Sequence, residues 1–312
     1  MESPQSSGTP TSKVNKNQNN HTQRVILHGG LGNQLFQWSY GHQLALKGQE
    51  IEFSFYKRPY ILEHTSTSLG DFLPNCSHGT FASKDLPKSR VGRVFLDPIH
   101  KRNLFSKVWA EIEDTTENPF VYSCPTPGRK AGIHFGYFQA SKSVIEVEEI
   151  LLKELWSTLE RRIRTPLEIE LSGAEIIHIR QGDTLTMSNM KKVGVLSSDY
   201  YSQIPLQSVR PRIVLTDDIE GAMKVLPSVR IDDIFGPSEL DVYQTIGVMA
   251  RAHSLYTANS TLSWWGGFLA RSRGAEVHIP NPFFREFHPE PKLSFAYPNF
   301  QLMKSHFMEV PT

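Results

Sequence analysis

The sequence predicts an α/β protein with two Rossmann-like halves, each a parallel sheet covered by helices, that face one another across a ligand cleft. Short apolar runs alternate with segments of helical periodicity, most clearly in the second half of the 312-residue chain. That length suits two domains of about 150 residues each. We therefore expect a disordered arm at residues 1–22, a first half at residues 23–160 and a second half at residues 161–312.

The first half is expected to begin with a strand, a helix and a second strand. Apolar or alternating runs predict its strands at residues 24–28, 51–55 and 133–139. A helix at residues 34–47 ends before Gly48, which stands where a C-terminal cap belongs. A capping-box pattern at residues 143–146 precedes a helix to about Arg162 that crosses to the second half. Residues 56–130 show no clean periodicity and predict irregular structure with one or two helices.

The second half alternates strands and helices more regularly. Apolar runs predict its strands at residues 175–179, 212–215, 254–257 and 276–279. Helices are expected after Ser198, after the Thr216–Asp218 turn, at residues 238–252 and in the apolar segment that ends at Arg271. This alternation predicts a parallel sheet with helices on both faces.

Composition indicates a soluble globular protein without a nucleic-acid partner. Hydrophobic residues make up 39% and charged residues 21%, and the formal net charge of +1 gives no basic footprint. The arm has too few apolar residues to fold or to act as a secretory signal, and no apolar run is long enough to span a membrane. These features predict a cytoplasmic protein. Cys76 and Cys124 lack metal-ligand spacing, and a single disulfide between them stays open.

The most informative segment is NSTLSWWGG at residues 259–267, where an apolar run gives way to a helix. Hydroxyl and amide side chains at such a turn favour an anion site, because free backbone N–H groups and the helix dipole point toward a bound phosphate. The alternative is a capped helix whose two tryptophans anchor an aromatic core. The segment predicts one of these two arrangements.

A glycine-rich turn at residues 29–34 follows the first predicted strand. Gly30 and Gly32 would let the backbone approach a ligand closely. A nicotinamide or flavin dinucleotide is not predicted, because Leu35 takes the place of the third glycine in that fingerprint. Asn33 either aims its amide into the cleft or caps the helix.

Arg180 ends the strand predicted at residues 175–179, at the edge where open parallel sheets place ligands. Its planar guanidinium suits a phosphate because it donates two parallel charge-assisted hydrogen bonds. Asp183 could orient that guanidinium or a substrate hydroxyl. The alternative is a structural ion pair between Arg180 and Asp183.

Three other acidic residues stand near predicted helix starts. Asp217 and Asp218 suit either a magnesium or manganese ion or helix capping. Asp241 lies three residues after Ser238, which is the spacing of a capping box. No cluster of His, Cys and carboxylate residues has convincing metal-ligand spacing, so no metal is expected.

Taken together, these motifs resemble those of the family 11 glycosyltransferases, the galactoside α-1,2-fucosyltransferases of bacteria and animals. The resemblance covers residues 24 to about 290. The matching segments occur in the family's order and are GGLGNQLFQ (29–37), FGYFQ (135–139), HIRQGD (178–183), LTDD (215–218) and ANSTLSWWGG (258–267). Each is weak alone, whereas five in order are specific.

The resemblance implies a GT-B fold, GDP-β-L-fucose as the donor, inversion at the anomeric carbon, and no metal or other cofactor. It implies that Arg180 and the hydroxyls of Ser260 and Thr261 hold the diphosphate. It also implies that His178 and Asp241 hold the guanine.

The glycine-rich loop, with Gly30, Gly32 and Asn33, would by the same resemblance lie near the fucose and the acceptor, a galactose-terminated oligosaccharide. Transfer to the 2-hydroxyl of the terminal β-galactose needs a general base, for which Asp183 and His28 are the candidates. If the acceptor is lipid-linked, association with the inner face of a membrane would be peripheral.

Gln181 departs from the family pattern, which has a second arginine there. That arginine either adds positive potential around the diphosphate or pairs with an acidic neighbour. Two alternatives to a galactoside fucosyltransferase follow: a transferase for another GDP-sugar or acceptor, and a catalytically weak homologue that binds sugar nucleotides or glycans.

Overall fold

The computed structural model describes residues 22–55, 69–73, 80–82, 121–125, 132–162, 165–182, 185–226, 230–286 and 295–311. Several expectations fall outside these residues: those for arm residues 1–21, for most of residues 56–130, for a bridge at Cys76 and for Asp183. The predicted arm ends one residue too late, because Thr22 is already part of the first strand.

The first half holds a five-stranded sheet in the order β3-β2-β1-β5-β4. Its strands are β1 (Thr22–Leu27), β2 (Glu50–Phe55), β3 (Thr80–Ala82), β4 (Val121–Pro125) and β5 (Gly132–Gly136). All neighbours pair in parallel except β4, which runs antiparallel to β5. β5 ends three residues before the predicted Gln139, because Phe138 adopts a positive φ of 50° that no extended strand accommodates.

The second half holds six strands that are all parallel, in the order β8-β7-β6-β9-β10-β11. These strands are β6 (Glu175–Ile179), β7 (Arg212–Thr216), β8 (Asp233–Phe235), β9 (Ser254–Tyr256), β10 (Glu276–Asn281) and β11 (Phe300–Lys304). Numbered from β6 in chain order, this is the 3-2-1-4-5-6 order of a Rossmann sheet. The predicted α/β class with two Rossmann-like sheets is confirmed.

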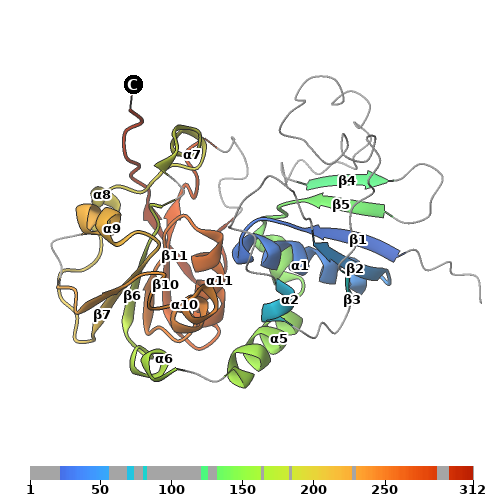
Figure 1. Cartoon of the computed structure of the whole chain (residues 1–312), viewed down its shortest axis with the longest axis horizontal. Coiled ribbons are helices and arrows are strands. Elements are labelled where there is room, and N and C mark those ends of the chain that lie inside the picture. Colours follow the sequence, from blue (N-terminus) through green and yellow to red (C-terminus); the bar gives the residue numbers. More distant parts are fainter. Residues whose placement is uncertain are drawn as a thin grey trace, which may run out of the picture.

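The helices cover both sheets (Figure 1). In the first half they are α1 (Leu31–Leu46), α2 (Leu69–Phe72), α4 (Ser141–Ile145) and α5 (Glu148–Arg161). In the second half they are α6 (Pro166–Glu170), α7 (Met187–Lys192), α8 (Ser198–Tyr201), α9 (Ile219–Val225), α10 (Val242–Met249) and α11 (Thr261–Arg271). Helices α1 and α11 lie between the two sheets (Figure 1).

Two predicted capping boxes are wrong. Ser143 lies inside α4, and α5 begins after Val147 without a side-chain cap. Helix α10 begins at Val242 rather than at Ser238, because Asp241 is itself the N-cap and its box partner is Gln244. The pattern Ser-x-x-Asp therefore predicts the helix start three residues too early.

One apolar cluster runs through both halves and contains the tryptophan pair. Trp264 and Trp265 are fully buried, and Phe36 of α1 packs against them with ring centroids 4.8 and 5.1 Å away. The interpretation of the tryptophans as an aromatic core anchor is therefore confirmed. Because α1 and α11 meet through these rings, the start of each helix is held against the other.

Candidate active site

The strand order of the second sheet reverses between β6 and β9, which are hydrogen-bonded neighbours. Open parallel sheets bind ligands outside the carboxyl ends of their strands at such a switch point. β6 leads directly into Arg180, and β9 leads into the segment that starts α11. Two motifs that are far apart in the sequence therefore reach one edge of the sheet.

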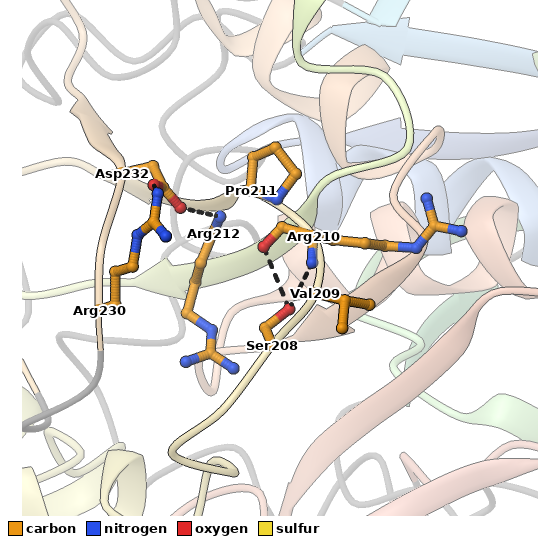
Figure 2. Close-up of a pocket in the computed structure, with 7 residues that line it drawn as sticks. All are labelled: Ser208, Val209, Arg210, Pro211, Arg212, Arg230 and Asp232. Atoms are coloured by element: carbon orange, nitrogen blue, oxygen red, sulfur yellow. Dashed lines mark hydrogen bonds and ion pairs between the residues drawn. The ribbon is translucent and has the colours of Figure 1, made fainter.

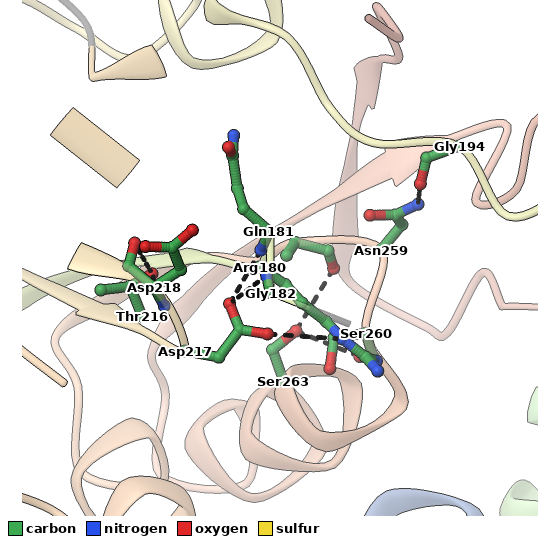
Figure 3. A network of polar contacts seen from close by, with 11 residues as sticks. Arg180, Gln181, Gly182, Gly194, Thr216, Asp217, Asp218, Asn259, Ser260 and Ser263 are labelled. Atoms are coloured by element: carbon green, nitrogen blue, oxygen red, sulfur yellow. Dashed lines mark hydrogen bonds and ion pairs between the residues drawn. The ribbon is translucent and has the colours of Figure 1, made fainter. Parts of the chain in front are cut away.

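Asp217 fixes the turn that carries Arg180. One carboxylate oxygen, Oδ1, accepts hydrogen bonds from the backbone N–H of Gln181 at 2.8 Å and of Gly182 at 3.2 Å. The other, Oδ2, lies 4.0 Å from Nε of Arg180. The Arg180 side chain is 30% exposed, so an anion from solvent could reach its guanidinium (Figure 3).

Asp218 has a separate, structural role. It is the N-cap of α9, and its side chain accepts a hydrogen bond from the backbone N–H of Gly221 at 3.0 Å. The capping interpretation is therefore confirmed for Asp218. Among the residues that the structure describes, no group of three or more His, Cys, Asp or Glu side chains could hold a metal ion.

The start of α11 presents donors toward the switch point. Ser260 is the N-cap and makes no side-chain capping bond, and the first helical bond runs from Trp264 N–H to its carbonyl at 3.0 Å. The backbone N–H groups of residues 261–263 thus have no acceptor within the helix, and with the helix dipole they suit a phosphate.

Two other polar residues of this motif hold the loop through hydrogen bonds to backbone carbonyls. The amide of Asn259 donates to the carbonyl of Gly194 at 3.0 Å, and the hydroxyl of Ser263 donates to the carbonyl of Ala258 at 3.2 Å. Both side chains are buried. At the helix start, the N-cap Ser260 is also buried, whereas Thr261 is partly exposed.

Asn33 joins the two halves. Its side-chain oxygen accepts hydrogen bonds from the hydroxyl of Thr261 at 3.0 Å and from the amide of Gln139 at 2.8 Å. Asn33 does not cap α1, whose N-cap is Gly30, so that alternative is wrong. The predicted residues Asn33, Thr261 and Ser260 are thus brought together at the meeting point of α1 and α11.

The two glycines predicted to approach a ligand differ in their surroundings. A Cβ atom on Gly32 would lie 2.4 Å from the backbone nitrogen of Leu262, whereas one on Gly30 would meet nothing within 4 Å. The close approach that Gly32 permits is therefore to the start of α11. Gly30 is exposed and open at the turn.

His178 and Asp241, the residues predicted to bind guanine, lie at different places. His178 is buried on β6, and burial, aided by the charge of Arg180, lowers its pKa to about 3, so the neutral ring offers hydrogen bonds but no charge. Asp241 is exposed and lines a cavity of about 600 Å³ between the halves. The other lining residues are Asp71, Phe72, Thr158, Arg161, Arg162 and Tyr243.

A smaller concavity of about 190 Å³ lies at the opposite edge of the second sheet, beside the amino end of β7 (Figure 2). Two of its three arginines are in ion pairs, Arg230 with Asp232 and Arg212 with Glu175 at 2.8 Å, while Arg210 donates to the backbone carbonyl of Gly173 at 3.2 Å. A pocket at the amino ends of the strands does not fit the pattern of a nucleotide site in a parallel sheet, which lies at the carboxyl ends.

Sequence reasoning missed Gln139 as a site residue. The FGYFQ segment contributes to the family resemblance, but its residues were assigned no role. The signal that could have found it is a polar residue directly after a strand that neighbours β1, at the carboxyl edge of the first sheet.

The side chain of Gln181 is buried against α9. Its side chain is 3% exposed, and a Cβ on Gly221 of α9 would lie 3.0 Å from its oxygen. Figure 3 shows it leaving the chain in a different direction from Arg180, on the side of Asp218. An arginine at this position would therefore lie near Asp218 rather than near the diphosphate. This favours the explanation that the family's second arginine pairs with an acidic neighbour over the explanation that it adds positive potential around the diphosphate.

We therefore expect Gln181→Arg to lower the free energy of unfolding by roughly 1 kcal/mol, because a longer, charged side chain enters a buried position whose acidic neighbour, Asp218, already caps α9. The affinity for GDP should stay within about twofold. Denaturant unfolding and isothermal titration at two salt concentrations measure both quantities, with Gln181→Met as a control for size without charge. Tighter binding that weakens as salt rises would instead support the electrostatic explanation.

The sequence comparison decides the family. The profile described as Glycosyl transferase family 11 matches residues 13–297 of this chain. The chain belongs to that family. Its predicted family membership is thereby confirmed, and glycosyltransferase activity follows as the family's chemistry.

Two curated relatives, both from Escherichia coli, align over most of the chain. The alpha-1,2-colitosyltransferase is 26% identical over 289 residues, covering 83% of this chain and 91% of that protein. The O-antigen biosynthesis glycosyltransferase WbnK is 23% identical over 283 residues, covering 83% and 93%.

Solved structures with a similar arrangement of elements include other glycosyltransferases. The fucosyltransferase NodZ from Bradyrhizobium superposes with a TM-score of 0.43 at 12% identity, covering 80% of this chain and 93% of that one. The heptosyltransferase WaaC from E. coli gives a TM-score of 0.38 at 8% identity, covering 90% and 92%. Among the described residues, none of the helices has the length and apolar character to cross a membrane.

Proposed function

We propose that this protein is an inverting glycosyltransferase that moves L-fucose from GDP-fucose to the 2-hydroxyl of a terminal β-galactose. The observation that carries the proposal is the switch point itself. There, the partly exposed side chain of Arg180 follows β6, and the N–H groups at the start of α11, which lack acceptors within the helix, follow the neighbouring strand β9. A nucleoside diphosphate is the ligand whose charge this arrangement fits.

The chemistry needs little else from the second half. The bond between the anomeric carbon and the diphosphate oxygen breaks, while the galactose 2-oxygen bonds to the opposite face of that carbon and gives its proton to a base. Negative charge grows on the departing GDP, so fixed donors aimed at the phosphates lower the barrier. Arg180, Ser260 and Thr261 would supply these donors.

The colitosyltransferase among the relatives supports an α-1,2 linkage and also favours a second donor. Colitose is L-fucose without its 3-hydroxyl, so a site built for one could accept the other. A site that hydrogen-bonds the 3-hydroxyl would reject colitose strongly, because its polar group would be left unpaired.

The test is incubation with lactose and, separately, GDP-fucose, GDP-colitose, GDP-mannose and UDP-galactose. We expect transfer from GDP-fucose, with an α-1,2 linkage in the product by NMR. A preference for GDP-colitose would mean that colitose, and not fucose, is the transferred sugar, while the proposed inverting transfer to the 2-hydroxyl would stand. Binding of GDP-fucose without transfer or hydrolysis would show a weak binding homologue, and use of UDP-galactose alone would reject the proposal.

Activity should survive excess EDTA, because the charge of the leaving group is met by Arg180 and the start of α11 in place of a metal ion. The initial rate of transfer to lactose, measured with and without EDTA, checks this. A loss that magnesium or manganese restores would show that a metal ion takes part.

A further inference from the structure

The orientation of the Asn33 amide is fixed by two donors at one end. Its carbonyl oxygen accepts from Gln139 at 2.8 Å and from Thr261 at 3.0 Å, which uses both lone pairs. Because the amide group is planar, its NH₂ must then point the other way. That nitrogen lies beside Gly29, where a Cβ would be only 2.7 Å from it, at the carboxyl end of β1.

Gln139 reaches Asn33 because the chain bends sharply just before it. Phe138 has a φ of 50°, a left-handed conformation that costs a bulky residue roughly 1–3 kcal/mol. Its ring is fully buried and stacks on Tyr40, with centroids 4.0 Å apart and planes 2° from parallel. Such a residue persists only where its surroundings hold it, and the bend it makes turns Gln139 back toward α1.

We propose that Gln139 is a positioning residue, which holds the Asn33 carbonyl so that the Asn33 NH₂ faces the sugar substrates at the glycine-rich turn. The proposal rests on the proposed function, since it is a sugar oxygen that this NH₂ would bind. Gln139 itself touches Asn33 and not the substrate. Its effect on the reaction therefore passes entirely through the direction of one amide group.

Two substitutions distinguish a role of Gln139 in orienting the Asn33 amide from a role in supporting the contact between α1 and α11. Gln139→Leu removes the hydrogen bond and leaves the Asn33 amide able to rotate. Gln139→Glu keeps the size of the side chain but can only accept at neutral pH, so Asn33 must turn its NH₂ toward the new carboxylate and its carbonyl toward the substrate. The hydroxyl of Thr261 adapts to either direction because it can both donate and accept.

If direction matters, kcat with GDP-fucose and lactose should fall about threefold in Gln139→Leu and at least tenfold in Gln139→Glu. The KM for GDP-fucose should stay within twofold, because the diphosphate contacts are unchanged. If Gln139 only supports the contact between α1 and α11, Gln139→Glu should instead resemble the wild type, because a charge-assisted bond replaces a neutral one. A Gln139→Glu variant as active as the wild type, and more active than Gln139→Leu, would overturn the proposal.

Asn33→Asp completes the design as a double-mutant cycle. The carboxylate that this substitution introduces still accepts from Gln139 but has no NH₂ to direct, so adding Gln139→Leu should change kcat no further. A further loss of tenfold would mean that Gln139 acts through another residue. The melting temperatures of the variants should match that of the wild type, which separates this effect from unfolding.

A second readout is independent of turnover. In ¹⁵N-labelled protein, the Asn33 side-chain NH₂ signals, identified by their loss in Asn33→Asp, should shift downfield in Gln139→Glu as the NH₂ bonds the carboxylate. No shift would overturn the fixed orientation. A wild-type protein that transfers no sugar would reject the proposed function, whereas this spectrum still decides whether Gln139 sets the amide.

Discussion

Arg180→Ala should lower kcat about a hundredfold and leave the fold intact. A charge-assisted, bidentate bond that strengthens as the diphosphate departs contributes roughly 3 kcal/mol to transition-state stabilisation. The side chain is 30% exposed, and its contact with Asp217 is 4.0 Å long, so its removal leaves no buried charge uncompensated. Initial rates with GDP-fucose and lactose, together with thermal unfolding, measure both effects.

Two further variants serve as controls for this result. Arg180→Lys should recover only part of the activity, because an ammonium keeps the charge but loses the planar fork. Arg230→Ala removes an equal charge from a side chain that is 83% exposed at the opposite edge of the same sheet, and it should leave the rate unchanged. Near-normal turnover of Arg180→Ala would show that Arg180 serves only its ion pair with Asp217.

Gly32→Ala should damage both stability and activity, although it adds a single methyl group. The new Cβ would lie 2.4 Å from the backbone nitrogen of Leu262 and 2.5 Å from the backbone carbon of Thr261, so α1 or the start of α11 must shift. Overpacking against backbone atoms costs about 2–3 kcal/mol, which should lower the melting temperature by roughly 5 °C. Because Thr261 moves with this shift, kcat should fall as well.

Gly30→Ala is the matched control, since a Cβ there meets nothing within 4 Å and the backbone has an ordinary negative φ. The melting temperatures of the two variants, measured by calorimetry, should therefore differ sharply. A Gly32→Ala protein as stable as Gly30→Ala would mean that the two helix starts do not meet closely in solution.

The sequence was most informative where local chemistry decides the structure. β6 was predicted at its observed bounds because three of its residues are isoleucines, which favour a strand buried on both faces. β11 was missed because its residues are mostly exposed and do not alternate cleanly. Asp241 was predicted as the last residue of a capping box that starts at Ser238, but it is the first residue of a box that ends at Gln244. Both pairs have the spacing of a capping box, and only the position of the helix start distinguishes them.

The site required knowledge that no local pattern contains. Asn33 and Thr261 are 228 residues apart in the chain and meet only because α1 and α11 pack together. The sequence proposed both as site residues by resemblance, yet it could not show that one donates to the other. Likewise, the direction of Gln181 depends on its packing against α9, which a family pattern of residue types does not specify.

The central claim is that the donor diphosphate binds where β6 and β9 diverge, and hydrogen–deuterium exchange with and without GDP tests it most directly. The N–H groups of residues 261–263 lack acceptors within α11, so a bound diphosphate that accepts from them should protect them. With saturating GDP, exchange in this segment should slow at least tenfold, while residues 208–212 at the opposite edge of the sheet stay unchanged. Unaltered exchange at residues 261–263, or protection at residues 208–212 in their place, would contradict the account.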